Sequence, residues 1–147
     1  MRSYILFSAL LATAVAGTLS ANPGQTALTL IEQTGVRGGF IVHLGCGEGE
    51  LTAALRINDS YQVHGIDRDR AKVSSARRHI DGLGIYGSVS ADYLNDNALP
   101  YSDNMVNLLV CEDPKALGIA AGEIQRVLVP NGVAYIKDDK NAWIKTQ

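Results

Sequence analysis

Three glycines at alternate positions, Gly45, Gly47 and Gly49, are the residues best suited to hold a ligand with their backbone. They follow the apolar run Phe40–Leu44 and precede a helix-like pattern that begins at about Glu50. Glycine lets the chain turn sharply and lets a ligand approach the backbone, and a helix N-terminus offers free N–H groups and the positive end of the helix dipole. The segment is therefore typical of a strand, a tight turn and a helix that together cradle a nucleotide-type ligand.

A carboxylate stands where such a ligand would need one. Asp67 ends the apolar segment Tyr61–Ile66 and lies roughly twenty residues beyond the glycines, where nucleotide-binding folds place an acidic residue that binds the ribose hydroxyls. Several cofactor classes share this geometry, so Asp67 indicates a nucleoside without choosing the cofactor. Asp67 could also cap the N-terminus of the next helix, and the two roles are compatible.

The spacing of the glycines departs from the dinucleotide fingerprint. That pattern, G-x-G-x-x-G, needs a glycine at the position of Glu50, whereas this chain has G-x-G-x-G. A dinucleotide-dependent oxidoreductase is therefore disfavoured. The glycines alone would also suit an ordinary strand-to-helix turn, so the order of the later segments has to decide.

Three segments carry a more specific pattern. Leu44–Gly49 reads LGCGEG, Ala98–Val110 reads ALPYSDNMVNLLV, and Glu123–Gly132 reads EIQRVLVPNG. They resemble the glycine loop, the LPFpdxsFDlv segment and the EixRvLkPGG segment of the class I S-adenosylmethionine-dependent methyltransferases of the small-molecule, type 11-like kind. The resemblance covers about Thr26–Asp138, and it implies a methyltransferase that uses S-adenosylmethionine and acts on a small molecule.

The resemblance also implies which residues contact the cofactor. The glycine loop would pass under the methionine part, Asp67 would bind the ribose, and Asp92 would hydrogen-bond the adenine amino group. Asp92 could equally be a loop residue that caps backbone N–H groups. The expected cofactor-binding residues are Gly45, Cys46, Gly47, Gly49, Asp67 and Asp92.

The acceptor side of the site matches the family less well. Asn107 stands where the family usually has Asp, and Asp113-Pro114 is only half of the acceptor-orienting motif of some amino-methylating members. Glu112 and Asp113 are candidates by position alone, and either could instead cap the following helix. No catalytic residue is assigned for this reason, and no metal site is expected.

Strand-like and helix-like segments alternate along the chain, which predicts an α/β fold with a doubly wound, Rossmann-like and mostly parallel sheet. Ligands bind at the carboxyl ends of the strands in such sheets, where the glycine turn, Asp67 and Asp92 would all lie. The expected helices are about Thr26–Gln33, Glu50–Asn58, Arg70–Ile80 and Ala116–Val127, and the five expected strands are Phe40–Leu44, Tyr61–Ile66, Gly87–Ala91, Met105–Val110 and Val133–Lys137.

The last two strands of the family's sheet are missing from this prediction. Trp143 and Ile144 are then apolar residues without an expected partner. We therefore expect either a C-terminally incomplete domain or an exposed edge strand that needs a partner. The chain also resembles the N-terminal portion of secreted bacterial proteins in which a similar domain precedes a β-propeller, which favours the incomplete domain and a further C-terminal domain.

Several single residues carry narrower expectations. His43 lies inside an apolar strand and is expected to be a hydrogen-bonded core residue.

Cys46 and Cys111 follow strands that should be neighbours, so a disulfide could form in an oxidising compartment, although two unpaired buried thiols are the preferred reading. The basic residues Arg68, Arg70, Lys72, Arg77 and Arg78 are expected to form a solvated helix face and not a phosphate site.

The first residues differ in composition from the rest. Residues 1–21 combine Arg2 with an apolar run and small residues, which is typical of a secretory signal peptide, and residues 22–147 remain as one domain. We therefore expect an exported, periplasmic or extracellular protein that touches a membrane only if the signal segment stays uncleaved. S-adenosylmethionine is made in the cytoplasm, so export favours the alternative of a non-catalytic binding or structural module.

The formal net charge of −2 gives no electrostatic reason to expect nucleic acid.

Overall fold

The computed structural model describes residues 22–138, 140 and 142–146, and the expected signal peptide lies outside these residues. In chain order the elements are α1 (Pro23–Thr34), β1 (Gly39–Leu44), α2 (Glu50–Ala54), β2 (Tyr61–Asp67), α3 (Arg70–Gly82), β3 (Val89–Tyr93), β4 (Val106–Cys111), α4 (Pro114–Leu117), α5 (Ala121–Val127), β5 (Leu128–Lys137) and β6 (Trp143–Thr146).

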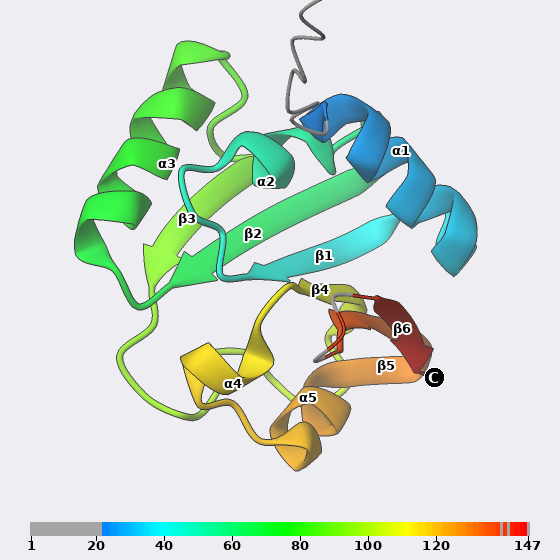
Figure 1. Cartoon of the computed structure of the whole chain (residues 1–147). Coiled ribbons are helices and arrows are strands. Elements are labelled where there is room, and N and C mark those ends of the chain that lie inside the picture. Colours follow the sequence, from blue (N-terminus) through cyan, green and yellow to red (C-terminus); the bar gives the residue numbers. More distant parts are fainter. Residues whose placement is uncertain (1–21, 139, 141, 147) are drawn as a thin grey trace, which may run out of the picture.

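The strands form a single sheet in the order β3-β2-β1-β4-β5-β6. The first five strands run parallel, and β6 runs antiparallel to β5. Helices α1, α2 and α3 lie on one face of the sheet, and α4 and α5 lie on the other (Figure 1). This arrangement confirms the predicted doubly wound α/β fold.

The central strand β1 is apolar on both sides because both faces of the sheet are covered. Ile41 belongs to the core beneath α1, α2 and α3, whereas Val42 and Leu44 belong to the core on the side of α4 and α5. All three side chains are fully buried. A buried parallel strand of this kind reads as an unbroken apolar run, which is why the strand could be recognised in the sequence.

Helix α1 begins three residues earlier than expected. The Asn22 side chain accepts a hydrogen bond from the Gly24 N–H at 2.9 Å, and Pro23 occupies the first helical position. Both features favour a helix start. The expected end is confirmed, because Gly35 adopts a left-handed conformation and donates its N–H to the Ile31 carbonyl. Among the described residues, no helix has the length and apolar character needed to cross a membrane.

Two elements on the α1 side differ from the expected bounds. Helix α2 ends at Ala54 and not near Asn58, because the Asn58 side chain instead accepts a hydrogen bond from the Ser60 N–H and stabilises a turn. Strand β3 begins at Val89, two residues later than expected, since Gly87 has a φ of 104°. The strand then continues through Tyr93, so Asp92 lies inside it and not after it.

The single helix expected over Ala116–Val127 is in fact two short helices. Gly118 has a left-handed φ of 64° and ends α4, and α5 begins at Ala121. The expected turn at Val129–Gly132 is present as a bulge within β5, where the register against β4 shifts between Val106 and Leu108.

The C-terminal residues add a sixth strand to the predicted sheet of about five strands. Since β6 pairs with β5, the alternative of β5 as an exposed edge was wrong. Tyr135 of β5 pairs with Lys145 of β6, and the ring of Trp143 stacks on the Tyr135 ring with centroids 5.1 Å apart. Trp143 therefore has an apolar partner. Ile144 remains exposed, as expected.

Candidate cofactor site

The glycine turn connects β1 to α2 in a conformation that only glycine adopts readily. Gly45, Gly47 and Gly49 have φ values of 77°, 53° and 88°. The N–H groups of Gly45 and Cys46 both donate to the Ile66 carbonyl of β2, at 2.7 and 3.2 Å. The turn is therefore held against the carboxyl end of the neighbouring strand.

Asp67 links this turn to the start of α3. Its Oδ2 accepts a hydrogen bond from the Gly47 N–H at 3.1 Å, and its Oδ1 accepts one from the Asp69 N–H at 2.9 Å. The residue is only 7% exposed. The alternative role of Asp67 as the N-cap of α3 was wrong, because Asp69 fills that position and accepts from the N–H groups of Ala71 and Lys72.

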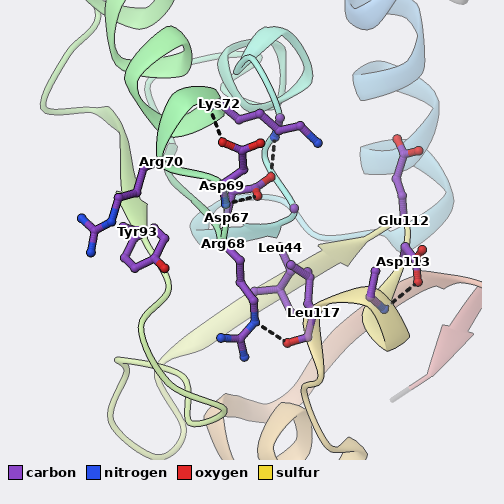
Figure 2. Close-up of a pocket in the computed structure, with 13 residues that line it drawn as sticks. Leu44, Asp67, Arg68, Asp69, Arg70, Lys72, Tyr93, Glu112, Asp113 and Leu117 are labelled. Atoms are coloured by element: carbon purple, nitrogen blue, oxygen red, sulfur yellow. Dashed lines mark hydrogen bonds between the residues drawn. The ribbon is translucent and has the colours of Figure 1, made fainter.

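A cavity of about 760 Å³ opens above the turn, at the carboxyl ends of β1, β2 and β4 (Figure 2). Pockets of roughly 300–1,000 Å³ are usual for small-molecule and cofactor ligands. The lining residues are Leu44, Gly45, Gly47, Asp67, Arg68, Asp69, Arg70, Lys72, Tyr93, Glu112, Asp113, Ala116 and Leu117. Of the residues expected to bind the cofactor, the cavity is thus lined by Gly45, Gly47 and Asp67.

Cys46 and Gly49 shape the turn from behind and do not line the cavity. A Cβ atom at Gly49 would lie 2.9 Å from the Cα of Ala76, so only glycine lets α3 approach the turn this closely. Cys46 packs in the same way against Gly65, where a Cβ would lie 2.6 Å from the Cβ of Cys46. Both residues set the shape of the cradle through packing.

Asp92 also lies outside the cavity lining, and Tyr93 takes part in its place. The Asp92 carboxylate bonds to the Arg77 guanidinium and, at 3.2 Å, to Nε2 of His64. Because β3 continues through both residues, successive side chains point to opposite faces of the sheet. Tyr93 therefore shares a face with Ala91 and the α3 side, whereas Asp92 points to the other. The assignment of Asp92 to the adenine stays a prediction.

Three cations line the cavity, although the sequence suggested a solvated helix face. Arg68 bonds to the Leu117 carbonyl at 2.8 Å, and the Arg70 guanidinium carbon lies 3.9 Å from the centre of the Tyr93 ring. Lys72 is the third. Periodicity could not reveal this, because Arg68 precedes α3 and the other two lie in its first turn, next to the strand ends.

Two carboxylates lie on the other side of the cavity (Figure 2). Glu112 forms an ion pair with Lys137 at 2.9 Å. Asp113 accepts a hydrogen bond from the Ala116 N–H at 3.0 Å, which confirms its expected alternative role as the N-cap of α4. Among the described residues, no His, Cys, Asp and Glu side chains are grouped so that they could hold a metal ion.

The two cysteines are free and buried, which confirms the preferred interpretation of unpaired thiols over the alternative of a disulfide. Cys46 packs in the core beneath α1, α2 and α3, whereas Cys111 packs on the opposite face of the sheet. Burial raises the pKa of each thiol to about 12, so both remain protonated near neutral pH.

His43 is a core residue, as expected. Its Nδ1 lies 2.8 Å from Oγ1 of Thr52, and burial lowers its pKa to about 4. The imidazole is therefore neutral at physiological pH. Nε2 is buried and has no hydrogen-bond partner within the described part of the chain.

The structure is an α/β domain with a cofactor-sized cavity at the carboxyl ends of its parallel strands. The chain belongs to the methyltransferase domain family, whose model matches residues 37–145. It is 34% identical over 113 residues to the ubiquinone/menaquinone biosynthesis C-methyltransferase UbiE of Hydrogenovibrio crunogenus. That match covers 69% of this chain and 43% of the relative.

Solved structures share the same fold at lower identity. A Methanococcus maripaludis protein assigned to the S-adenosyl-L-methionine-dependent methyltransferases has a TM-score of 0.69 and 22% identity, over 78% of this chain and 54% of its own. The [4+2]-cyclase SpnF has a TM-score of 0.65 and 23% identity, and the match covers 77% of this chain and 43% of SpnF. A third structure is the geranyl diphosphate C-methyltransferase from Streptomyces coelicolor in complex with Mg²⁺, geranyl diphosphate and S-adenosyl-L-homocysteine. Its TM-score is 0.67 and its identity 19%, over 76% of this chain and 44% of its own.

These matches confirm the expected family and support S-adenosylmethionine as its cofactor. The chain spans about half the length of the relatives that it matches.

Proposed function

We propose that the chain binds S-adenosylmethionine in the cavity above the glycine turn and transfers its methyl group to a small molecule. One observation carries this proposal. The buried Asp67 carboxylate lines the cavity and is held by the N–H groups of Gly47 and Asp69, one on each of its oxygens. A carboxylate has about four acceptor sites, so two remain for the hydroxyls of a ribose.

The described residues suit the rest of this cofactor as well. Gly45 and Gly47 have left-handed backbones and no side chains, so the backbone of the turn is accessible from the cavity. A Cβ at Gly47 would meet nothing within 4 Å, which shows that there is open space beside it. The carboxylates of Glu112 and Asp113 lie on another side of the cavity and would attract the positively charged ammonium and sulfonium groups.

The bound cofactor would supply a methyl group on a sulfonium sulfur. The acceptor's nucleophilic atom would bond to the methyl carbon as the carbon–sulfur bond breaks, and the sulfur would leave as the thioether of S-adenosylhomocysteine. The chain's own contribution would be to position the two reactants and to exclude water. No side chain at the cavity is assigned as a general base, since Glu112 is paired with Lys137 and Asp113 caps α4. A small molecule is the proposed acceptor, as geranyl diphosphate is for a relative of the same fold.

A second candidate is a binding or structural module that keeps the fold without methyl transfer. SpnF, which is named as a [4+2]-cyclase, has the same fold, so the fold alone does not require methyl transfer. The dinucleotide-dependent oxidoreductase remains a weaker alternative, because Glu50 occupies the position of the third fingerprint glycine.

Isothermal titration calorimetry of the full chain with S-adenosylhomocysteine, and with NAD as a control ligand, tests the proposal. Wild type should bind S-adenosylhomocysteine and not NAD. Asp67→Ala should weaken this binding by about a hundredfold, because two charged hydrogen bonds to the ribose are lost. Asp67→Asn, which keeps the size of the side chain, should have an intermediate effect. Asp81→Asn on the exposed end of α3 is the matched control and should bind like wild type.

Absence of binding by folded wild-type protein would contradict the proposal and favour the non-catalytic module. If S-adenosylhomocysteine binds, a methyl-transfer assay against a panel of small molecules then separates the enzyme from a module that only binds the cofactor. Binding of NAD alone would favour the oxidoreductase.

We also propose that residues 1–21 direct export of the chain, since their composition is that of a signal peptide. Mass spectrometry of the N-terminus of protein recovered from its host tests this. A mature chain that begins after Ala16 or Ala21 supports export, whereas an intact N-terminus in the cytoplasmic fraction contradicts it.

A further inference from the structure

Arg68 lines the cavity beside Leu117 (Figure 2), and its hydrogen bonds join the cavity to two other segments of the chain. Its Nε donates a hydrogen bond to the Leu117 carbonyl at 2.8 Å. Its Nη2 donates to the Asp96 carbonyl at 3.0 Å and to Oδ1 of Asn97 at 2.6 Å. Leu117 ends α4, whereas Asp96 and Asn97 lie between β3 and β4. One side chain therefore ties the end of β2 to both segments.

Helix α4 is a short helix that lies over the glycine turn. It has only four residues, and a helix of about one turn is unstable by itself in water. Leu117 is its buried residue, and Leu117 Cδ1 would lie 3.5 Å from a Cβ at Gly45, so this side chain covers the glycine turn. Gly118 then reverses the chain beside Arg68. The contacts of Leu117 thus link α4 both to the glycine turn and to Arg68.

The charge of Arg68 is not neutralised by these contacts. Its three acceptors are two backbone carbonyls and one amide oxygen. In the part of the chain that the structure describes, no carboxylate lies within ion-pair distance of Arg68. Loss of the guanidinium would consequently free both segments without leaving a buried carboxylate unpaired, which separates this contact from an ordinary structural salt bridge.

We propose that Arg68 is a positioning residue of the cofactor pocket. Through Leu117 it holds α4 over the glycine turn, and through Asp96 and Asn97 it holds the segment that follows Tyr93. The inference rests on the proposed function for the identity of the ligand, whereas the hold on the two segments stands on the hydrogen bonds alone.

The test compares Arg68→Met with Arg78→Met in the full chain. Methionine keeps the apolar stem and removes the donors. Arg78 lies on α3, and among the described residues its guanidinium bonds to Ser74 and Ser75, so Arg78→Met removes the same charge away from the cavity. Without ligand, hydrogen–deuterium exchange at the amides of Leu94, Ala116 and Gly118 should become faster in Arg68→Met and stay unchanged in Arg78→Met. Calorimetry should show S-adenosylhomocysteine binding about tenfold weaker in Arg68→Met only.

Each other outcome has a definite meaning. Unchanged exchange together with unchanged binding overturns the inference. Weaker binding with unchanged exchange means that Arg68 contacts the ligand itself, which also overturns a positioning role. Faster exchange with unchanged binding shows that the two segments do not matter for the pocket, and this result overturns it as well.

Two further results remain distinguishable. If wild type binds no S-adenosylhomocysteine, the proposed function fails, and the exchange measurement alone then supports or overturns the hold of Arg68 on the two segments. If circular dichroism shows that Arg68→Met is unfolded, Arg68→Lys replaces it. Lysine keeps the charge but cannot reach three acceptors with the same geometry, so exchange should still rise.

Discussion

Two arginines, Arg68 and Arg126, both fasten the segment between β3 and β4, yet they do so with different partners. Arg126 donates to the carbonyls of Leu99 and Tyr101 and forms ion pairs with Glu123 and Asp103. Arg68 lines the cavity, and within the described residues it donates to neutral oxygens. We therefore expect Arg126 to stabilise the fold as a whole, and Arg68 to stabilise the pocket.

The largest expected effect on stability comes from removing Arg126. Arg126→Met leaves the carboxylate of Glu123, whose side chain is 18% exposed, without its cation. We expect the Tm to fall by roughly 5–10 °C, because a network that joins α5 to the segment around Leu99 is lost. Arg68→Met should lower the Tm by no more than about 3 °C on the same scale. Differential scanning calorimetry of the two variants measures both effects, and equal losses would contradict the distinction.

The two arginines should also differ in how their contribution to stability depends on pH. The hydrogen bond to Arg126, followed by that to the Leu99 N–H, lowers the pKa of Glu123 from 4.5 to about 2. Since the pKa in the folded state lies below that in the unfolded state, the stabilisation is fully present above about pH 4.5 and is lost as the pH falls towards 2. Arg68 has no carboxylate partner among the residues that the structure describes, and it should add no such dependence.

Urea denaturation of wild type and Glu123→Gln at several pH values checks this expectation. Glu123→Gln should be less stable than wild type at pH 7, and the difference should shrink steadily below pH 4.5. The difference between wild type and Arg68→Met serves as the control and should not change over that range. A constant difference for Glu123→Gln would show that its carboxylate charge is not what stabilises the fold.

The smallest expected effect concerns the glycine beside Arg68. Gly118 has a φ of 64°, so Gly118→Ala should cost about 1 kcal/mol through backbone strain. A Cβ there would lie 3.6 Å from Oδ1 of Asn97, which is an ordinary contact. Gly82→Ala at the end of α3 meets nothing within 4 Å and is the matched control, with an effect near zero or slightly stabilising. Urea denaturation curves of both variants give these values, and equal behaviour would mean that α4 tolerates the strain by shifting.

The better predicted half of the molecule runs from β1 to α3. Its central strands are buried on both faces and appear as apolar runs in the sequence. The glycine turn follows β1 and Asp67 ends β2, and these two strands are parallel neighbours. Local pattern was therefore enough to place Gly45, Gly47 and Asp67 at one site, and the structure brings them together around the cavity.

The second half was predicted less well because its features depend on residues that are distant in the sequence. Helical periodicity runs through Gly118, but the backbone there is left-handed and divides the expected helix. Strand β6 pairs with β5 and Trp143 stacks on Tyr135, and the sequence pattern of either segment alone does not reveal these contacts.

The sequence by itself determined the α/β class, the family and the carboxylate that faces the glycine turn, because these follow from short-range patterns of glycine, apolar residues and acid. Only the tertiary structure decided that Tyr93 and not Asp92 lines the cavity, since this depends on where β3 ends and hence on which face each side chain occupies. It also decided that Arg68 faces the pocket, because its partners Leu117 and Asp96 approach it only once the sheet has assembled.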